Sequence, residues 1–271
     1  MQRGLAASVL VAVICGILGG FVVLKGLAFI GDALAHASFG GVALAFVLGF
    51  NIYLGAFVFA LATALGIGAI TRRGRVSSDT AIGVLFSGTF AFGILIISRV
   101  DGYTTDLFGY LFGDVLSITA SDLWTILILG VVVLLLVAVF YRQLIFVGFD
   151  PTVAAAAGLR AGALNYLLLA LLGATIVTAI QAVGIVLVVA LLVTPAATAY
   201  LITRRFHHMI AASSGIGAVC AVLGIYLSYY LNVASGAAII LVATTLFLIT
   251  LALTGLPDKA IEPEGGEGEP V

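Results

Sequence analysis

The sequence of residues 5–24 is LAASVLVAVICGILGGFVVL, a run of twenty residues without a charged side chain. A helix needs about 20 mostly apolar residues to cross the hydrocarbon core of a bilayer. Similar runs recur along the chain, and the eight that we expect to cross a membrane are Leu5–Leu24, Ile52–Ile70, Ala81–Ser98, Leu123–Tyr141, Ala163–Ile180, Ile185–Ile202, Ile210–Leu231 and Gly236–Leu256. The sequence therefore predicts an all-α, polytopic transmembrane helical bundle of about eight spans over residues 1–256.

The composition of the whole chain agrees with a membrane protein. Hydrophobic residues make up 63% of the 271 residues and charged residues only 8%, whereas soluble domains carry about 25% charged residues. No basic patch with interleaved aromatic residues is present, so we expect a lipid bilayer and no nucleic acid as a partner. The sequence also lacks the metalloprotease pattern His-Glu-x-x-His, the Gly-x-Ser-x-Gly pattern and the phosphate-binding loop, so an enzyme is not expected.

The stretch Lys25–Asn51 is apolar but interrupted by charged residues, a histidine and the pair Gly40-Gly41. It is either a ninth span or a broken, partly re-entrant element. Positively charged loops favour the cytoplasm, and the chain offers four such groups: Arg3, the loop with Arg72, Arg73 and Arg75, the pair Arg142 and Arg160, and Arg204-Arg205. All four face the cytoplasm only if Lys25–Asn51 adds no crossing; otherwise the N-terminus lies outside. We expect eight crossings.

Asp32 and His36 are the clearest candidates for chemistry, because ionisable groups inside a membrane are costly and usually functional. Their spacing of four places them on one face of a helix, one turn apart. A carboxylate oxygen and an imidazole nitrogen suit zinc or manganese, but two ligands do not fill a coordination shell. A second copy of the chain would supply two more. Alternatively, the two side chains pair only with each other, or Asp32 caps a helix start.

Three further features are predicted from local sequence. Pro195 lies inside a span and is a possible helix kink, since proline removes a backbone hydrogen bond. The small-residue pairs Gly16/Gly20 and Ser213/Gly217 favour close helix packing inside the bundle, with a dimer face as the alternative. Residues 257–271 carry four Glu and one Asp among Gly and Pro, which predicts a disordered acidic cytoplasmic tail.

Five segments together resemble one protein family. They are Asp32–Leu44, Ala81–Gly88, Asp106–Asp114, Phe149–Leu159 and Ala182–Thr198. In this order they resemble the permeases of ABC-type zinc/manganese/iron uptake systems, over about Lys25–Arg205. The chain departs from the family pattern at Gly40, where relatives often have proline.

The resemblance implies a homodimeric permease of an ABC importer in the cell membrane of a prokaryote. The partners it implies are a second copy of the chain, two cytoplasmic ATP-binding subunits and an extracellular metal-binding protein. It implies a transported divalent ion (zinc, manganese or iron) and no permanently bound cofactor. It also strengthens the assignment of Asp32 and His36 to metal translocation, because the family pattern has an Asp and a His there.

The family further implies an ATPase-coupling element in the segment Gln143–Leu159, which Arg142 and Arg160 place in the cytoplasm. The residues expected to dock on the ATPase are Asp150, Ala154, Ala155, Ala156, Ala157 and Gly158. The alternative for this segment is an ordinary interfacial helix. For the whole chain, the alternatives are a permease that carries a metal chelate and a membrane scaffold or sensor without transport activity.

Overall fold

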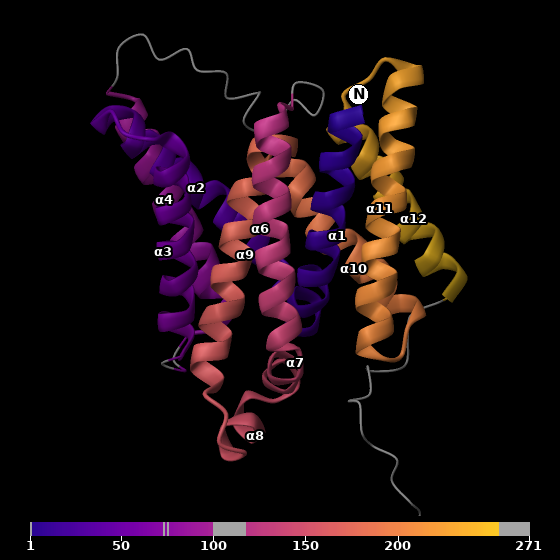
Figure 1. The fold of residues 1–271 in the computed structure, drawn as a ribbon. Helices are drawn as coiled ribbons and strands as arrows, with labels where there is room; N and C mark the ends of the chain where they lie inside the picture. Colours follow the sequence, from indigo (N-terminus) through magenta and orange to yellow (C-terminus); the bar gives the residue numbers. More distant parts are fainter. Residues whose placement is uncertain (1, 73, 75, 100–117, 255–271) are drawn as a thin grey trace, which may run out of the picture.

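The structure is a computed structural model that describes residues 2–72, 74, 76–99 and 118–254. The described part of the chain is helical apart from short connections (Figure 1). Its helices are α1 (Gln2–Leu24), α2 (Ile30–Leu48), α3 (Ile52–Arg72), α4 (Ser78–Ile97), α6 (Ala120–Val139), α7 (Tyr141–Phe149), α8 (Pro151–Ala156), α9 (Ala161–Val183), α10 (Ile185–Ile202), α11 (Phe206–Leu231) and α12 (Ser235–Thr254).

Several helix ends are fixed by local sequence. Ser77 caps α4 by accepting a hydrogen bond from the backbone N–H of Thr80 at 3.2 Å. Thr119 and Asp122 form a reciprocal capping box at the start of α6. Gly49 ends α2 in a left-handed conformation with φ of 72°, which glycine adopts without the steric cost of a Cβ atom.

Nine helices in the described residues are long and apolar enough to cross a membrane, one more than the eight crossings expected. The eight expected spans are present, and the ninth is α2. It runs unbroken from Ile30 to Leu48 through Gly40 and Gly41. The helix continues through both glycines, which allow close approach of neighbouring helices: a Cβ atom on Gly40 would lie 2.7 Å from the carbonyl oxygen of Thr89 on α4.

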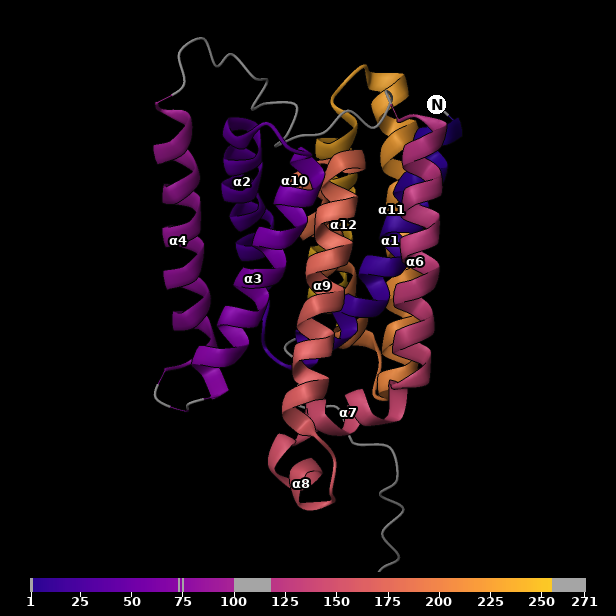
Figure 2. The ribbon, with the colours of Figure 1, turned by 60° about the vertical axis from the view of Figure 1, so that its left-hand side comes forward.

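The helices form two groups joined by α9. On one side α1 packs against α10 and α11, with α12 beside α10 and α11; on the other side α2, α3 and α4 pack together. Helix α9 contacts α3 and α2 as well as α6, α1 and α10. Figure 2 shows α4 at the edge of the molecule, where it packs mainly on α2 and α3. Only 17% of its span is buried, against 67% for α1, so α4 presents most of its surface to lipid or to another chain.

The two pairs of small residues expected to pack closely meet each other. A Cβ atom on Gly16 of α1 would lie 2.8 Å from the Cα of Ser214, and one on Gly217 of α11 would lie 3.2 Å from the carbonyl oxygen of Ala12. This confirms the expectation of tight packing inside the bundle. Nearby, Pro195 is buried within α10, which continues as one helix on both sides of it; a kink at this residue stays a prediction.

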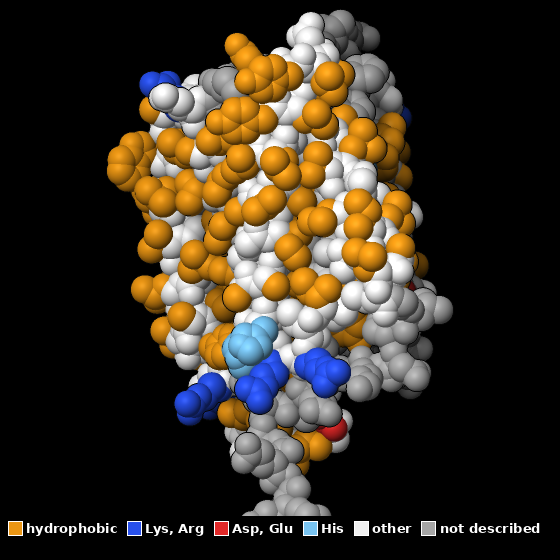
Figure 3. Space-filling model, turned by 90° about the vertical axis from the view of Figure 1, so that its right-hand side faces the viewer, with side chains coloured by type: hydrophobic (Ala, Val, Ile, Leu, Met, Phe, Trp, Pro, Cys, Tyr) orange, Lys and Arg blue, Asp and Glu red, His pale blue; other side chains and the backbone are white. Residues whose placement is uncertain are grey.

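The ends of the molecule differ in charge. Figure 3 shows hydrophobic side chains over most of one face, with most of the visible Lys and Arg side chains and the His side chains at its lower end and other basic side chains near its upper edge. Helices α7 and α8 lie at that same end, and the N-terminus lies at the opposite end (Figure 1). By the positive-inside rule, the end with α7 and α8 is cytoplasmic. The N-terminus lies at the opposite end, so the structure does not group Arg3 with the other basic loops as the sequence led us to expect.

Two expectations lie outside the described residues. One is the acidic tail over residues 257–271. The other is the segment Asp106–Asp114, which carries part of the family resemblance.

Candidate functional site

Asp32 and His36 lie in the first two turns of α2 and contact each other. The Nδ1 atom of His36 lies 3.2 Å from Oδ1 of Asp32 and 3.0 Å from the backbone carbonyl oxygen of the same residue. A carbonyl oxygen only accepts hydrogen bonds, so Nδ1 carries the hydrogen and donates it. In the neutral ring this leaves Nε2 with a free lone pair. The remaining Asp32 oxygen is also accessible, since 43% of the side chain is exposed in the single chain, against 20% for His36.

The alternative of a helix cap at Asp32 is not supported. The N-cap position of α2 is Phe29, and no side-chain capping hydrogen bond is present there. Asp32 instead contributes a negative charge to the first helical turn, where the helix dipole favours it. The alternative that Asp32 and His36 interact only with each other is consistent with this contact. The contact nevertheless leaves one nitrogen of His36 and one oxygen of Asp32 without a partner in the pair.

Two aromatic rings from α4 hold the imidazole of His36. The ring centroids of Phe86 and Phe90 lie 5.2 Å and 5.3 Å from that of His36, each nearly perpendicular to it. The two phenylalanines stack on each other with 6.1 Å between centroids. The rings restrict the rotation of His36 and shield one side of it from water. Neither phenylalanine was predicted as a site residue, although their spacing of four on one helix indicates a shared face.

One chain does not provide a complete metal site in the part that the structure describes. No group of three or more His, Cys, Asp or Glu side chains close enough to hold a metal ion occurs among these residues. Phe29, Asp32 and His36 lie three and four residues apart, so they share one face of α2, and Phe29 is 70% exposed. This face of α2 is incompletely covered by the single chain.

The expected coupling segment forms two short helices, α7 and α8. Oδ1 of Asp150 accepts hydrogen bonds from the N–H groups of Thr152 at 2.7 Å and Val153 at 3.0 Å, which caps α8. Pro151 follows at the first helical position, where its missing N–H has no cost. Gly158 ends the segment with φ of 84°, a conformation that side chains other than glycine rarely adopt.

The small residues of α8 and its end do not all face outward. Ala154 is fully buried and packs inward, whereas Ala155, Ala156, Ala157 and Gly158 are exposed. A groove of about 850 Å³ opens beside them, lined by residues of α7, by Asp150 and Val153, and by His207 at the start of α11. The surface available to a partner therefore comprises the exposed small residues and this groove.

Comparison with known proteins places these features in a family. The model of the ABC 3 transport family matches residues 1–254. The chain is 47% identical over 249 residues to the manganese transport system membrane protein MntC of Listeria monocytogenes, covering 92% of this chain and 89% of that protein. It is 42% identical over 250 residues to the manganese import system permease protein ScaB of Streptococcus gordonii, covering 92% and 90%.

A solved structure has the same fold. The structure described as PsaBC from Streptococcus pneumoniae in complex with Fab is similar with a TM-score of 0.81 and 42% sequence identity. The similarity covers 92% of this chain and 90% of that one.

Proposed function

This chain belongs to the ABC 3 transport family, as a membrane-spanning permease of a metal ABC transporter, and on that premise we propose that it carries manganese ions into the cell. It is a multi-pass protein of the cell membrane and not itself an enzyme. In the proposed cycle, two cytoplasmic ATP-binding subunits drive transport, and an extracellular metal-binding protein delivers the ion. Two copies of the chain form the pathway.

The observation that carries this proposal is the contact between Asp32 and His36 on α2. Placing ionisable groups at membrane depth costs about 2.5–3.5 kcal/mol each on insertion scales, which is hard to explain without a function. In the neutral ring the hydrogen on Nδ1 is directed at Asp32, so Nε2 has the lone pair that a metal requires. A carboxylate or carbonyl accepting from the second nitrogen of a metal-binding histidine is a common supporting arrangement.

A second copy completes the coordination shell in this proposal. One Asp and one His from each of two chains give four ligands. The incompletely covered face of α2 and the exposed surface of α4 provide area for such an association. We infer that the two α2 helices approach each other across a two-fold axis, with both Asp32 side chains and both His36 side chains facing the pathway.

The choice of manganese rests on chemistry and on the relatives together. Carboxylate oxygen and imidazole nitrogen ligands accept manganese, zinc and iron, and the metal available often decides between them. The relatives described above are named as manganese transport proteins. A bare ion is favoured over a metal chelate because the α2 pair offers free ligand atoms, which a chelated ion does not need.

The coupling role belongs to α8 and its end in this proposal. Asp150 and Pro151 fix the start of α8, and Gly158 fixes its end, so the exposed run Ala155–Ala157 is held in a defined orientation. Small side chains allow a helix to lie deep in a groove of a partner. We propose that this run contacts the ATP-binding subunit and passes its movement to α7 and α9.

Uptake of radioactive manganese tests the proposal in cells that express the chain with its ATP-binding subunit and binding protein. Asp32→Asn and His36→Gln are each expected to reduce uptake by roughly tenfold or more, because the first removes the carboxylate charge and the second removes the imidazole nitrogen, both without removing bulk. Asp79→Asn is the matched control, since Asp79 is exposed at the cytoplasmic start of α4. Unchanged uptake in both α2 variants, at equal protein levels, contradicts the proposed metal site.

A further inference from the structure

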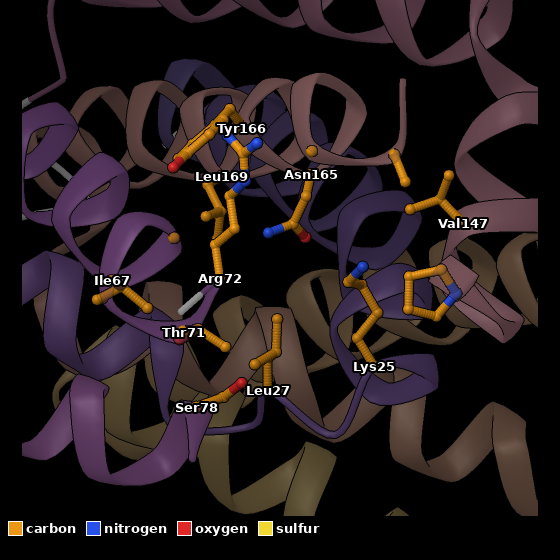
Figure 4. Close-up of a pocket in the computed structure, with 14 residues that line it drawn as sticks. Lys25, Leu27, Ile67, Thr71, Arg72, Ser78, Val147, Asn165, Tyr166 and Leu169 are labelled. Carbon is orange, nitrogen blue, oxygen red and sulfur yellow. The ribbon is translucent and has the colours of Figure 1, made fainter. Parts of the chain in front are cut away.

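The cytoplasmic end of the bundle contains a cavity that Asp32 and His36 do not line. A cavity of about 360 Å³ lies where the turn between α1 and α2, the end of α3 and the starts of α4 and α9 converge, with α7 and α8 at its border. Its volume is within the range of small-molecule binding pockets, about 300–1,000 Å³. Figure 4 shows Lys25, Arg72 and Asn165 extending into the space that these elements enclose.

The cavity is positively charged. Lys25 comes from the turn after α1 and Arg72 from the last turn of α3, and among the described residues that line the cavity none is Asp or Glu. Throughout the described part of the chain, neither cation makes an ion pair with a carboxylate, since Asp32–His36 is the ion pair found there. Burial without a carboxylate lowers the pKa of Lys25. Lys25 is half-buried and Arg72 is exposed, and an anion between them would neutralise both charges.

Hydrogen-bond donors surround the same space. The hydroxyl of Thr71 is buried and has no hydrogen-bond partner, although helical threonines elsewhere in the chain, such as Thr89 and Thr198, donate to the carbonyl four residues before them. The side chains of Asn165 and Ser78 also line the cavity. Helix α9 begins at the cavity wall without a side-chain cap, and free N–H groups at a helix start attract anions. Cations, hydroxyls and an amide together match an oxyanion with several acceptor oxygens.

We propose that this cavity binds the phosphate group of an anionic ligand. Arginine and lysine with neighbouring N–H and O–H donors are the groups that recognise phosphate. Two sources share this chemistry: the headgroup of an anionic phospholipid in the inner leaflet, and a soluble phosphate compound. Basic pockets between transmembrane helices on the cytoplasmic side bind lipid headgroups in other proteins, and apolar Leu27, Ile67 and Leu169 form part of the wall here.

The position of the cavity gives binding a consequence for transport. Lys25 precedes α2, which carries Asp32 and His36, while Pro151 at the border of the cavity begins α8. A bound phosphate therefore links the helix of the metal pair to the coupling segment and to α3. This consequence rests on the proposed function, whereas the binding itself does not.

Binding is tested on the purified full-length chain in neutral detergent micelles, without transport. The thermal unfolding midpoint is measured during titration with phosphatidylglycerol, with phosphatidylcholine of the same acyl chains, and with inorganic phosphate. We expect phosphatidylglycerol or inorganic phosphate to raise the midpoint and phosphatidylcholine to have no effect. If only inorganic phosphate raises the midpoint, the ligand is a soluble phosphate compound, and if only phosphatidylglycerol does, it is a lipid. If both raise it and compete, the cavity accepts the phosphate group from either source.

Variants locate the ligand in the cavity. Lys25→Gln and Arg72→Gln are each expected to weaken binding roughly fivefold, the effect of one cation near a charged headgroup. Arg204→Gln is the matched control, because it removes an exposed cation at the same end of the molecule. Gly162→Leu retains both cations but fills space, since a Cβ atom there has no neighbour closer than the Arg72 guanidinium at 4.0 Å.

Three results overturn the proposal. The first is the absence of a midpoint shift with both phosphatidylglycerol and inorganic phosphate. The second is wild-type affinity for the phosphate ligand both in Gly162→Leu and in the double variant Lys25→Gln, Arg72→Gln. A loss of affinity in Arg204→Gln as large as the loss in these variants also overturns it. Size-exclusion profiles establish that each variant is folded. Failure of metal uptake in the Asp32 and His36 variants has no bearing on these outcomes.

Discussion

The orientation of a single ring determines what the Asp32–His36 pair can do. Free rotation of His36 would present either nitrogen to the pathway. The backbone carbonyl of Asp32 fixes Nδ1 as the donor, and Phe86 and Phe90 hold the ring edge-on. Aromatic contacts of this kind contribute about 0.5–1.5 kcal/mol beyond the burial of area. The sequence predicted the pair from its spacing, but it did not predict the phenylalanines because they come from a different helix.

The close contacts of Gly41 on α2 predict that a larger residue at this position lowers the stability of the protein. A Cβ atom on Gly41 would overlap the backbone carbonyl of Gly55 on α3 and lie 2.7 Å from the Cβ of Phe59. Gly41→Ala is therefore expected to lower the free energy of unfolding by about 1–3 kcal/mol, the usual effect of overpacking. The measurement is the midpoint of thermal unfolding in detergent.

Gly88→Ala on α4 is the control for this prediction. A Cβ atom at Gly88 would have no neighbour within 4 Å, and alanine favours a helix over glycine by about 1 kcal/mol. We expect Gly88→Ala to unfold at the same or a higher temperature than the unsubstituted chain. Equal midpoints for Gly41→Ala and Gly88→Ala contradict the close packing of α2 on α3.

At the scale of the element, α2 shows why the sequence underestimated the number of spans. In a hydropathy profile Asp32 and His36 interrupt the apolar run of α2, yet the two side chains contact each other and need not face lipid. Glycine pairs resemble breaks, yet Gly40 and Gly41 allow α3 and α4 to approach. Both features depend on neighbours in space. The other eight spans were predictable because uninterrupted apolar runs of about 20 residues need no such information.

The helices in the segment Gln143–Leu159, to which we assign the coupling role, were also predicted in part. Flanking arginines and excess length indicated a cytoplasmic element between spans, and the structure places α7 and α8 at the end with most of the basic side chains. Which alanines are exposed was not predictable, because the burial of Ala154 depends on how α8 packs at the end of the bundle.

A bulky side chain on α8 is expected to uncouple transport from ATP hydrolysis. Ala156 is exposed and lies in the run proposed to enter the partner groove. Ala156→Trp should abolish co-purification with the ATP-binding subunit and ATP-driven manganese uptake, because an indole does not fit a space shaped for a methyl group. Ala211→Trp, at an exposed position near the cytoplasmic end of α11, is the control and should retain both. If Ala156→Trp co-purifies with the ATP-binding subunit and takes up manganese at the wild-type level, α8 is not the coupling element.

The whole molecule combines a packed bundle with an acidic extension. Residues 257–271 lack the apolar periodicity needed to join a core. We propose that residues 1–256 form the permease domain and that the tail is dispensable. Removal of residues 259–271 is expected to leave manganese uptake and the thermal unfolding midpoint unchanged. A loss of uptake at equal protein level gives the tail a role in transport.

The number of crossings decides on which side of the membrane each end of the chain lies. Eight crossings place both ends on one side, whereas nine place them on opposite sides. The structure has nine candidate spans in its described residues, with the N-terminus opposite the end that holds α7 and α8. Arg3 is then an exception to the positive-inside rule, outweighed by the basic residues around Arg72, Arg142 and Arg204, since orientation follows the overall bias of the loops.

Cysteine labelling tests this topology in intact cells. Cys15 and Cys220 are buried and unpaired, so a background with both replaced by alanine reports only on introduced thiols. A membrane-impermeant maleimide is expected to label Gln2→Cys in intact cells, and to label Gly74→Cys and Thr254→Cys only after permeabilisation. Labelling of Gln2→Cys and Gly74→Cys from the same side would mean that α2 does not cross the membrane. Asp32 and His36 would then lie on a re-entrant helix open to one side only, and a pathway through paired α2 helices would be excluded.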